Sequence, residues 1–244
     1  FPDNLNDPFI LCYLCKYNYF NLVKLLLDEE SLNYNFCFKS KKLKFNVSPL
    51  YLASVNSNTK IVDLLLHQSK IEFNSCSFFN YKNLIEISIP SYLTSIKERV
   101  FYGCSNLTRI TIPLSIEKIE NGAFEKCKSM EQVIIPESVV SIGDRAFRDC
   151  CSLKDISIPS SVISIGEKAF ENCLSLVEIK IPESVSDISY CMFNKCKALK
   201  KIILHSNLST IGAYAFSECS SLIEFNYPSK QEMIKAFTFN KCTS

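Results

Sequence analysis

The sequence predicts a repeat solenoid of the α+β class, in which short stacked coils share a parallel β-sheet face and follow a small helical part. Three observations support this prediction. Apolar and special residues recur every 23 positions, each unit contains one stretch of strand-like alternation that ends at Pro, and the first 75 residues follow a different repeat. With 244 residues and 47% hydrophobic composition, the chain can bury a substantial core.

The 23-residue period is carried by four columns of residues. Ile recurs at 96, 119, 142, 165, 188, 211 and 234, and Pro recurs at 90, 113, 136, 159, 182 and 228, with His205 in one Pro position. The other two columns are Phe at 78, 101, 124, 147, 170, 193, 216 and 239, and Cys at 104, 127, 150, 173, 196, 219 and 242. Four columns in one register indicate a stack of equivalent units.

One unit, CCSLKDISIPSSVISIGEKAFENC from residue 150, shows what each coil contains. Alternation in its first part predicts a strand with Ile156 and Ile158 facing inward. Pro159 removes a backbone donor and ends that strand, and Gly166 suits a turn. The segment 166–173 is long enough for one helical or 3₁₀ turn.

A single coil cannot bury its own Leu, Ile and Phe side chains, so neighbouring coils must stack. We therefore predict about seven coils over residues 76–244, the last incomplete, with the Phe column as an internal spine. At ~4.8 Å between strands, the sheet would extend about 30 Å. A capping repeat is missing after Cys242, so we expect the natural protein to continue beyond Ser244.

The unit resembles the BspA-like, or Treponema-type, leucine-rich repeat, whose pattern C-x-x-L-x-x-I-x-I-P-x-x-V-x-x-I-G-x-x-A-F matches residues 77–244 nearly position for position. The resemblance implies a right-handed leucine-rich-repeat coil stack. It also implies protein binding, because members of that family are described as surface antigens and adhesion proteins.

Residues 1–75 follow a step of 39, since LVKLLL at 22–27 returns as IVDLLL at 61–66. The second copy resembles an ankyrin repeat, with Pro49, Leu50 and Ala53 opening the first helix and the Leu64–Leu66 run filling the second. Ser57 and Ser69 replace the usual Gly residues, and about six extra residues occur around 39–46. We interpret the pair as degenerate ankyrin-like repeats that either dock against the first coil as its cap or continue from further repeats upstream.

Charge and hydropathy exclude several classes of function. The 27 Lys and Arg residues nearly balance 25 Asp and Glu residues, which argues against a nucleic-acid partner. Apolar stretches are far shorter than the roughly 20 residues that cross a bilayer, so we expect no membrane insertion in this stretch. The start of the chain shows no signal peptide, and we interpret the chain as a fragment of a longer one.

Candidate reactive groups do not form a catalytic or metal-binding pattern. We interpret the Cys column as packed thiols and the CxxC at Cys12 and Cys15 as core residues, which leaves Cys151 and Cys191 as the candidate reactive thiols. His67 and His205 are about six coils apart and cannot share a site. We therefore predict no enzyme activity, no metal and no cofactor.

The outward positions of the predicted strands form the candidate partner-binding site, on the open, concave face of the sheet. Because side chains alternate along a strand, these positions face away from the core. They carry three positive and four negative charges that alternate, together with apolar residues: Glu86, Ser88, Arg109, Thr111, Gln132, Ile134, Asp155, Ser157, Glu178, Lys180, Lys201, Ile203, Glu224 and Asn226. Either this strip is a solvated face of paired charges, or it binds a protein.

Two functions remain open. The first is a non-enzymatic scaffold that binds a partner protein through the sheet face. The alternative is a BspA-like cell-surface adhesin or antigen that binds host or matrix ligands. Free thiols and the lack of a leader favour a cytoplasmic location, whereas the resemblance and the glycosylation-type triplets at Asn46, Asn106 and Asn207 favour the cell surface.

Overall fold

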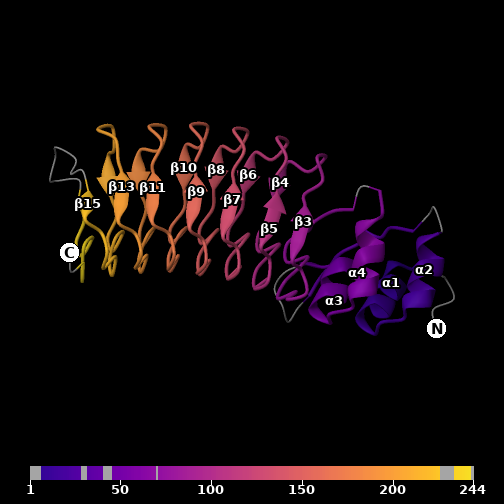
Figure 1. The fold of residues 1–244 in the computed structure, drawn as a ribbon. Helices are drawn as coiled ribbons and strands as arrows, with labels where there is room; N and C mark the ends of the chain where they lie inside the picture. The colour runs from indigo at the N-terminus through magenta and orange to yellow at the C-terminus, as the bar shows by residue number, and fades with distance from the viewer. Residues whose placement is uncertain (1–6, 29–31, 41–45, 70, 226–233, 243–244) are drawn as a thin grey trace.

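Four helices lie at one end of a long stack of coils (Figure 1). The structure is a computed structural model that describes residues 7–28, 32–40, 46–69, 71–225 and 234–242. Hydrophobic residues of the helices and of the coils belong to one continuous core, which extends from Leu11 to Leu222. The helical part and the coils are therefore packed against each other.

The four helices form two similar pairs. The first pair is α1 (Pro8–Lys16) and α2 (Phe20–Leu27), and the second is α3 (Pro49–Val55) and α4 (Thr59–Leu66). Both first helices begin with Pro after a residue whose side chain accepts a backbone hydrogen bond, Asp7 or Ser48. The turn inside each pair contains one left-handed residue, Asn18 or Ser57, so the step of 39 is preserved in the backbone.

The extra residues between the two pairs contain a short antiparallel hairpin. Strand β1 (Phe38–Lys39) pairs with β2 (Asn46–Val47), and residues 41–45 between them lie outside the described part of the chain. Phe36 and Phe38 pack against Phe9 of α1, with ring centroids 5.0 and 5.2 Å apart. The hairpin thus lies against the first helix.

The predicted strands are present in every coil and form what we call the first ladder. Its members are β3 (Glu86–Ser88), β5 (Arg109–Thr111), β7 (Gln132–Ile134), β9 (Asp155–Ser157), β11 (Glu178–Lys180), β13 (Lys201–Ile203) and β15 (Glu224–Phe225). They pair in parallel with a shift of 23 residues, within the groups β3–β5, β7–β9 and β11–β13–β15. Seven strands one coil apart correspond to about six full turns of a β-solenoid.

A second ladder, which the sequence did not indicate, follows each Pro-containing loop. Its strands are β4 (Ser95–Ile96), β6 (Lys118–Ile119), β8 (Ser141–Ile142), β10 (Ser164–Ile165), β12 (Asp187–Ile188) and β14 (Thr210–Ile211). Strands β4, β6, β8 and β10 form one parallel sheet, and β12 pairs with β14. The Ile column therefore ends short strands, with the Ile side chains buried between the ladders.

Gly166 has a different role from the turn predicted for it. Its backbone is outside the left-handed region, but a Cβ atom there would lie 2.4 Å from the backbone N of Asp144 in the preceding coil. Glycine is thus required by the close approach of two backbones rather than by its conformational freedom.

The predicted helical or 3₁₀ turn around each Phe is wrong, because these segments are consecutive turns. Two residues per coil, four positions apart, adopt left-handed conformations, and most are not Gly, for example Arg145 and Asp149. The turns pair with the next coil through backbone hydrogen bonds such as Phe147 N–H to the Ala169 carbonyl oxygen, 2.8 Å. This third set of bonds between coils holds residues that would otherwise avoid the left-handed region.

The predicted Phe spine is confirmed. Rings of adjacent coils stack with centroids 5.3–5.6 Å apart, from Phe78 to Phe239, and the first seven are fully buried. Each Cys of the column donates its thiol hydrogen to the carbonyl oxygen of the Phe 26 residues earlier, at 3.0–3.2 Å. All thirteen thiols are free, so the Cys column ties coils together without disulfides.

A serine column connects coils in the same way, in the loops between the first-ladder and second-ladder strands. Ser115, Ser138, Ser161 and Ser184 each donate their hydroxyl to a carbonyl oxygen of the preceding coil, at 2.5–2.8 Å. The next position holds Asn207, and here the Nε2 atom of His205 lies 3.0 Å from the Val185 carbonyl oxygen that a serine would reach. His205 thus replaces the missing hydroxyl, which explains why it occupies a Pro position.

Removing one ring from the spine should destabilise the whole stack. Phe147 is fully buried between Phe124 and Phe170, so we expect Phe147→Ala to lower the free energy of unfolding by about 3–5 kcal/mol. Urea unfolding followed by far-UV circular dichroism measures the change. Ile163→Ala, at a side chain 63% exposed, is the control and should leave the midpoint nearly unchanged. Equal midpoints for the two variants would contradict the spine as the main stabilising element.

Candidate protein-binding face

The structure places the predicted outward residues on the exposed side of the first ladder. Along β3, β7, β9 and β11 the central residue is buried and both neighbours are exposed, as strand alternation predicts. Lys201 and Ile203 of β13 are half-buried, and Asn226 lies outside the described residues. The remaining positions form one continuous row, which we call the open face.

Part of the charge on the open face is paired between neighbouring coils. Arg109 and Glu86 are register partners, and their side chains form an ion pair of 2.9 Å. Lys201 and Glu224 form another, of 3.4 Å. Such exposed pairs contribute less than ~1 kcal/mol each. They organise the surface without making a large contribution to stability.

The middle of the open face combines an apolar side chain with a shallow depression. Ile134 is 74% exposed, although it belongs to a strand. A hollow of about 560 Å³ lies beside it, lined by β5, β7 and the residues before them, including Arg109 and Gln132. A mixed polar and apolar surface of this kind is typical of protein interfaces.

A buried ion cluster on the turn edge was missed by the sequence analysis. Arg148 lies 3.4 Å from Glu125 and 2.9 Å from Glu171, in the preceding and following coils. Asn194 donates its side-chain amide to Glu171 one coil further, at 2.9 Å. Glu125 and Glu171 are almost fully buried. The sequence signal for this cluster is that the position directly after each Phe is charged or polar from Glu125 onward, at the same 23-residue step.

Burial raises the pKa of the Glu125 carboxyl, and the nearby Arg148 guanidinium opposes that rise.

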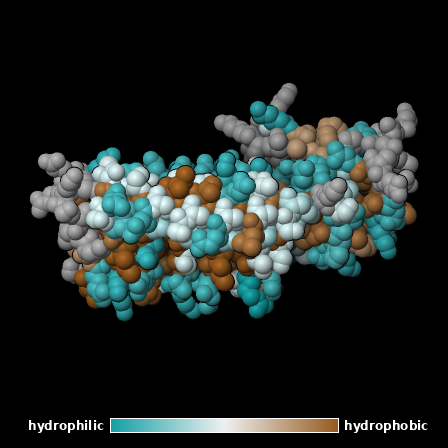
Figure 2. All heavy atoms as spheres, turned by 90° about the horizontal axis from the view of Figure 1, so that it is seen from above, coloured by the Kyte–Doolittle hydropathy of each residue, from teal (hydrophilic) through white to brown (hydrophobic). Residues whose placement is uncertain are grey.

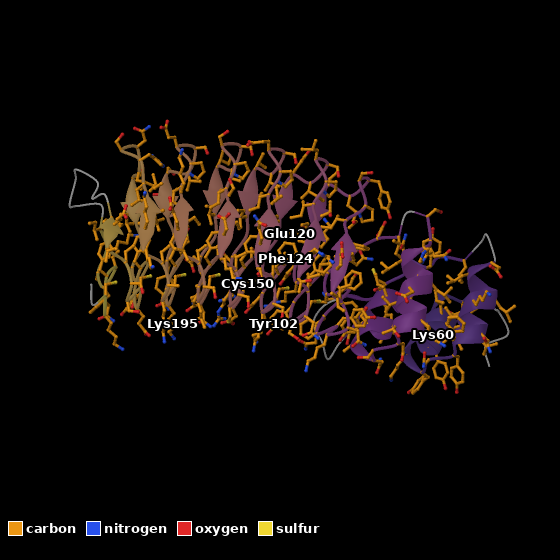
Figure 3. All side chains as sticks on the ribbon, in the orientation of Figure 1. Lys60, Tyr102, Glu120, Phe124, Cys150 and Lys195 are labelled. Atoms are coloured by element: carbon orange, nitrogen blue, oxygen red, sulfur yellow. The ribbon has the colours of Figure 1, made fainter. Side chains whose placement is uncertain are left out.

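The turn edge is the side of the stack formed by the turns around each Phe. Figure 3 shows Tyr102 and Lys195 at the lower margin of the stack and Phe124 inside it. Since the cluster joins three successive coils on this edge, it fixes their register by charge as well as by backbone pairing.

Most of the described thiols are buried, which does not favour reactive chemistry. Burial raises the pKa of Cys12 to about 12 and the pKa of Cys15 further still. Cys191, predicted as a reactive thiol, is only 5% exposed, and burial raises its pKa as well. That prediction is therefore wrong for Cys191, whose side chain is buried. Cys151 is half-exposed, but burial also raises its pKa.

Three further features bear on function in the described part of the chain: metal-binding groups, histidine sites and membrane-spanning helices. No group of three or more His, Cys, Asp or Glu side chains there could hold a metal ion. His67 and His205 each contact a backbone carbonyl oxygen, of Asp63 and Val185 respectively. Among the described helices, none is long and apolar enough to cross a membrane.

The surface of the stack has no single apolar or polar side in the view of Figure 2, where hydrophobic and hydrophilic side chains alternate along its length.

The buried cluster predicts a specific pH dependence. A carboxyl whose pKa is higher in the folded than in the unfolded chain stabilises the fold at low pH and loses that contribution as pH rises through the folded pKa. Arg148 limits the rise in the pKa of Glu125. We therefore expect the free energy of unfolding of Arg148→Met to fall more steeply between pH 4.5 and 7.5 than that of the unmodified chain. At pH 7.5 the variant should be less stable by about 2 kcal/mol.

Urea midpoints at both pH values measure this effect. Arg109→Met is the matched control, since it removes an Arg from an exposed pair with Glu86. The control should behave like the unmodified chain at both pH values. A parallel drop for the two variants would mean that the buried cluster has no special role.

Comparison with known proteins places this architecture in a family. The model for the BspA type leucine rich repeat region matches six copies, over residues 52–162 and 140–244. A search of curated proteins finds no match.

Two solved structures show the same coil stack. The crystal structure of a leucine rich repeat protein from T. pallidum is 32% identical, with a TM-score of 0.58 over 61% of this chain and 70% of that one. A leucine-rich repeat protein from Eubacterium ventriosum is 22% identical, with a TM-score of 0.51, and the match covers 65% of this chain but only 52% of that one. The second likeness concerns the fold alone.

The family model covers most of the chain: its match begins inside α3 and includes all the coils that carry the two ladders and the Phe spine. The chain therefore belongs to the BspA type leucine-rich repeat family.

Proposed function

We propose that this protein is a non-enzymatic interaction scaffold that binds a partner protein through the open face of the first ladder. The observation that carries the proposal is the exposed Ile134, set beside a shallow depression and within a row of charges of both signs. An exposed apolar side chain among polar ones suits protein recognition. A nucleic acid would instead require a row of like positive charges, which the open face lacks.

The helical part would serve as the cap of the scaffold. In this proposal residues 1–75 are two degenerate ankyrin-like repeats, and residues 76–244 are the leucine-rich coils. The Asn58 side chain donates to the Cys15 carbonyl oxygen at 2.6 Å and joins the two helix pairs. Phe73 then meets Phe78 edge to face, with centroids 5.1 Å apart, where the coils begin. These contacts would shield the first coil from water, as capping repeats do.

A cell-surface adhesin or antigen of the BspA-like type is the second candidate. Asn106 and Asn207, in two of the three glycosylation-type triplets, are both exposed. The same open face would then engage host or matrix ligands instead of a partner inside the cell.

Charge reversal on the open face tests the scaffold proposal. The variant Arg109→Glu, Glu178→Lys, Lys201→Glu reverses three charges of this face, and we expect it to reduce crosslinked capture of a partner from native lysate by about tenfold, because like charges would then meet across the interface. Quantitative mass spectrometry of the captured proteins provides the readout.

A matched control carries the same net change away from the open face: Glu117→Lys, Lys118→Glu and Lys235→Glu, all exposed residues at or beside the second ladder. It should capture the partner as the unmodified chain does. Capture that is unchanged in the open-face variant, while circular dichroism shows it folded, would reject this face as the binding site.

A further inference from the structure

The second ladder stops at β4, although the chain before it continues in register. Residues 71–74 align with 94–97 at the 23-residue step, and Phe73 falls in the Ile column, where it is buried. Yet no backbone hydrogen bond joins residues 71–74 to β4, and the Ile71 carbonyl oxygen instead accepts from the Tyr92 hydroxyl at 2.8 Å. The ladder is thus open between the helical part and the first coil.

Two backbone donors of the first coil face this opening. In the next coil, the N–H groups of Glu117 and Glu120 donate to the carbonyl oxygens of Thr94 and Ile96, both at 2.9 Å. The equivalent donors one coil earlier are Thr94 N–H and Lys97 N–H, and neither has a partner among the described residues. Unpaired donors at a strand edge are a template for another strand.

A cleft occupies the opening itself. It measures about 450 Å³, with Phe73 and Asn74 on one wall and residues 92–95 and Lys97 on the other. Its volume is within the range of small-molecule pockets, so it has room for a few residues of an extended chain. The side-chain nitrogen of Asn74 is buried and has no hydrogen-bond partner, so the wall opposite β4 offers one more donor.

We propose that this cleft binds an extended peptide segment of a partner protein, which adds to β4 as a further parallel strand of the second ladder. The donors at Thr94 and Lys97 require two carbonyl oxygens from residues two apart on an extended chain, as Thr94 and Ile96 supply to the next coil. A β-strand provides that spacing. Because Phe73 already fills the inward position, the segment carries small or β-branched side chains there. The site is separate from the open face.

A peptide copied from the chain's own second ladder is a suitable probe. The nonapeptide ESVVSIGDR, residues 137–145, includes Val140 and Ile142, whose carbonyl oxygens accept from the following coil at 3.0 and 2.8 Å. We expect the labelled peptide to bind saturably by fluorescence anisotropy. Amide exchange at Thr94 and Lys97, followed by nuclear magnetic resonance, should slow by about tenfold when the peptide is bound.

Two matched controls keep the test decisive. The same peptide with Ile142→Pro cannot continue a ladder and should not bind. On the protein, Lys97→Pro removes one donor while Lys97→Ala retains it, and both lose the Lys97–Glu120 ion pair. Only the Pro variant should lose peptide binding. Equal binding of both peptides, equal binding by both Lys97 variants, or unchanged exchange at Thr94 and Lys97 would overturn the proposal.

Discussion

The structure depends on one constraint: a coil can bury its apolar side chains only against the next coil. Every column that repeats at 23 residues serves this contact, most directly the Phe rings stacked 5.3–5.6 Å apart. Backbone pairing follows from the same spacing, since two ladders, each interrupted between some coils, and a row of paired turns connect neighbouring coils. Because each contact is repeated, small contributions accumulate along the stack.

Close stacking also explains residues that look unfavourable in isolation. Non-glycine residues such as Lys168 and Glu218 adopt left-handed conformations because the turns around them bond to neighbouring coils. Polar groups inside the stack are satisfied between coils, as with the Cys thiols, the serine hydroxyls and His205. The Glu125–Arg148–Glu171 cluster extends this principle to charge.

Stacking does not constrain the residues that point outward from the first ladder. We therefore expect the functional residues among these outward positions. The open face carries exposed charges and Ile134, none of which the core requires. At the junction with the helices the repetition is interrupted, and the donors of Thr94 and Lys97 are left without partners. Both proposed sites are thus places where the sequence departs from what packing alone demands.

The sequence by itself determined the coil, the spine and the open face, because a strict period fixes which residues meet in neighbouring coils. Alternation was enough to assign Ile156 and Ile158 to the core and Gln132 and Ile134 to the surface. Only the tertiary structure decided the second ladder, the left-handed turns and the burial of Cys191, since these depend on backbone contacts between coils that leave no local pattern. The Arg148 cluster was similarly hidden, because charged residues ordinarily indicate solvent, and only stacking encloses these.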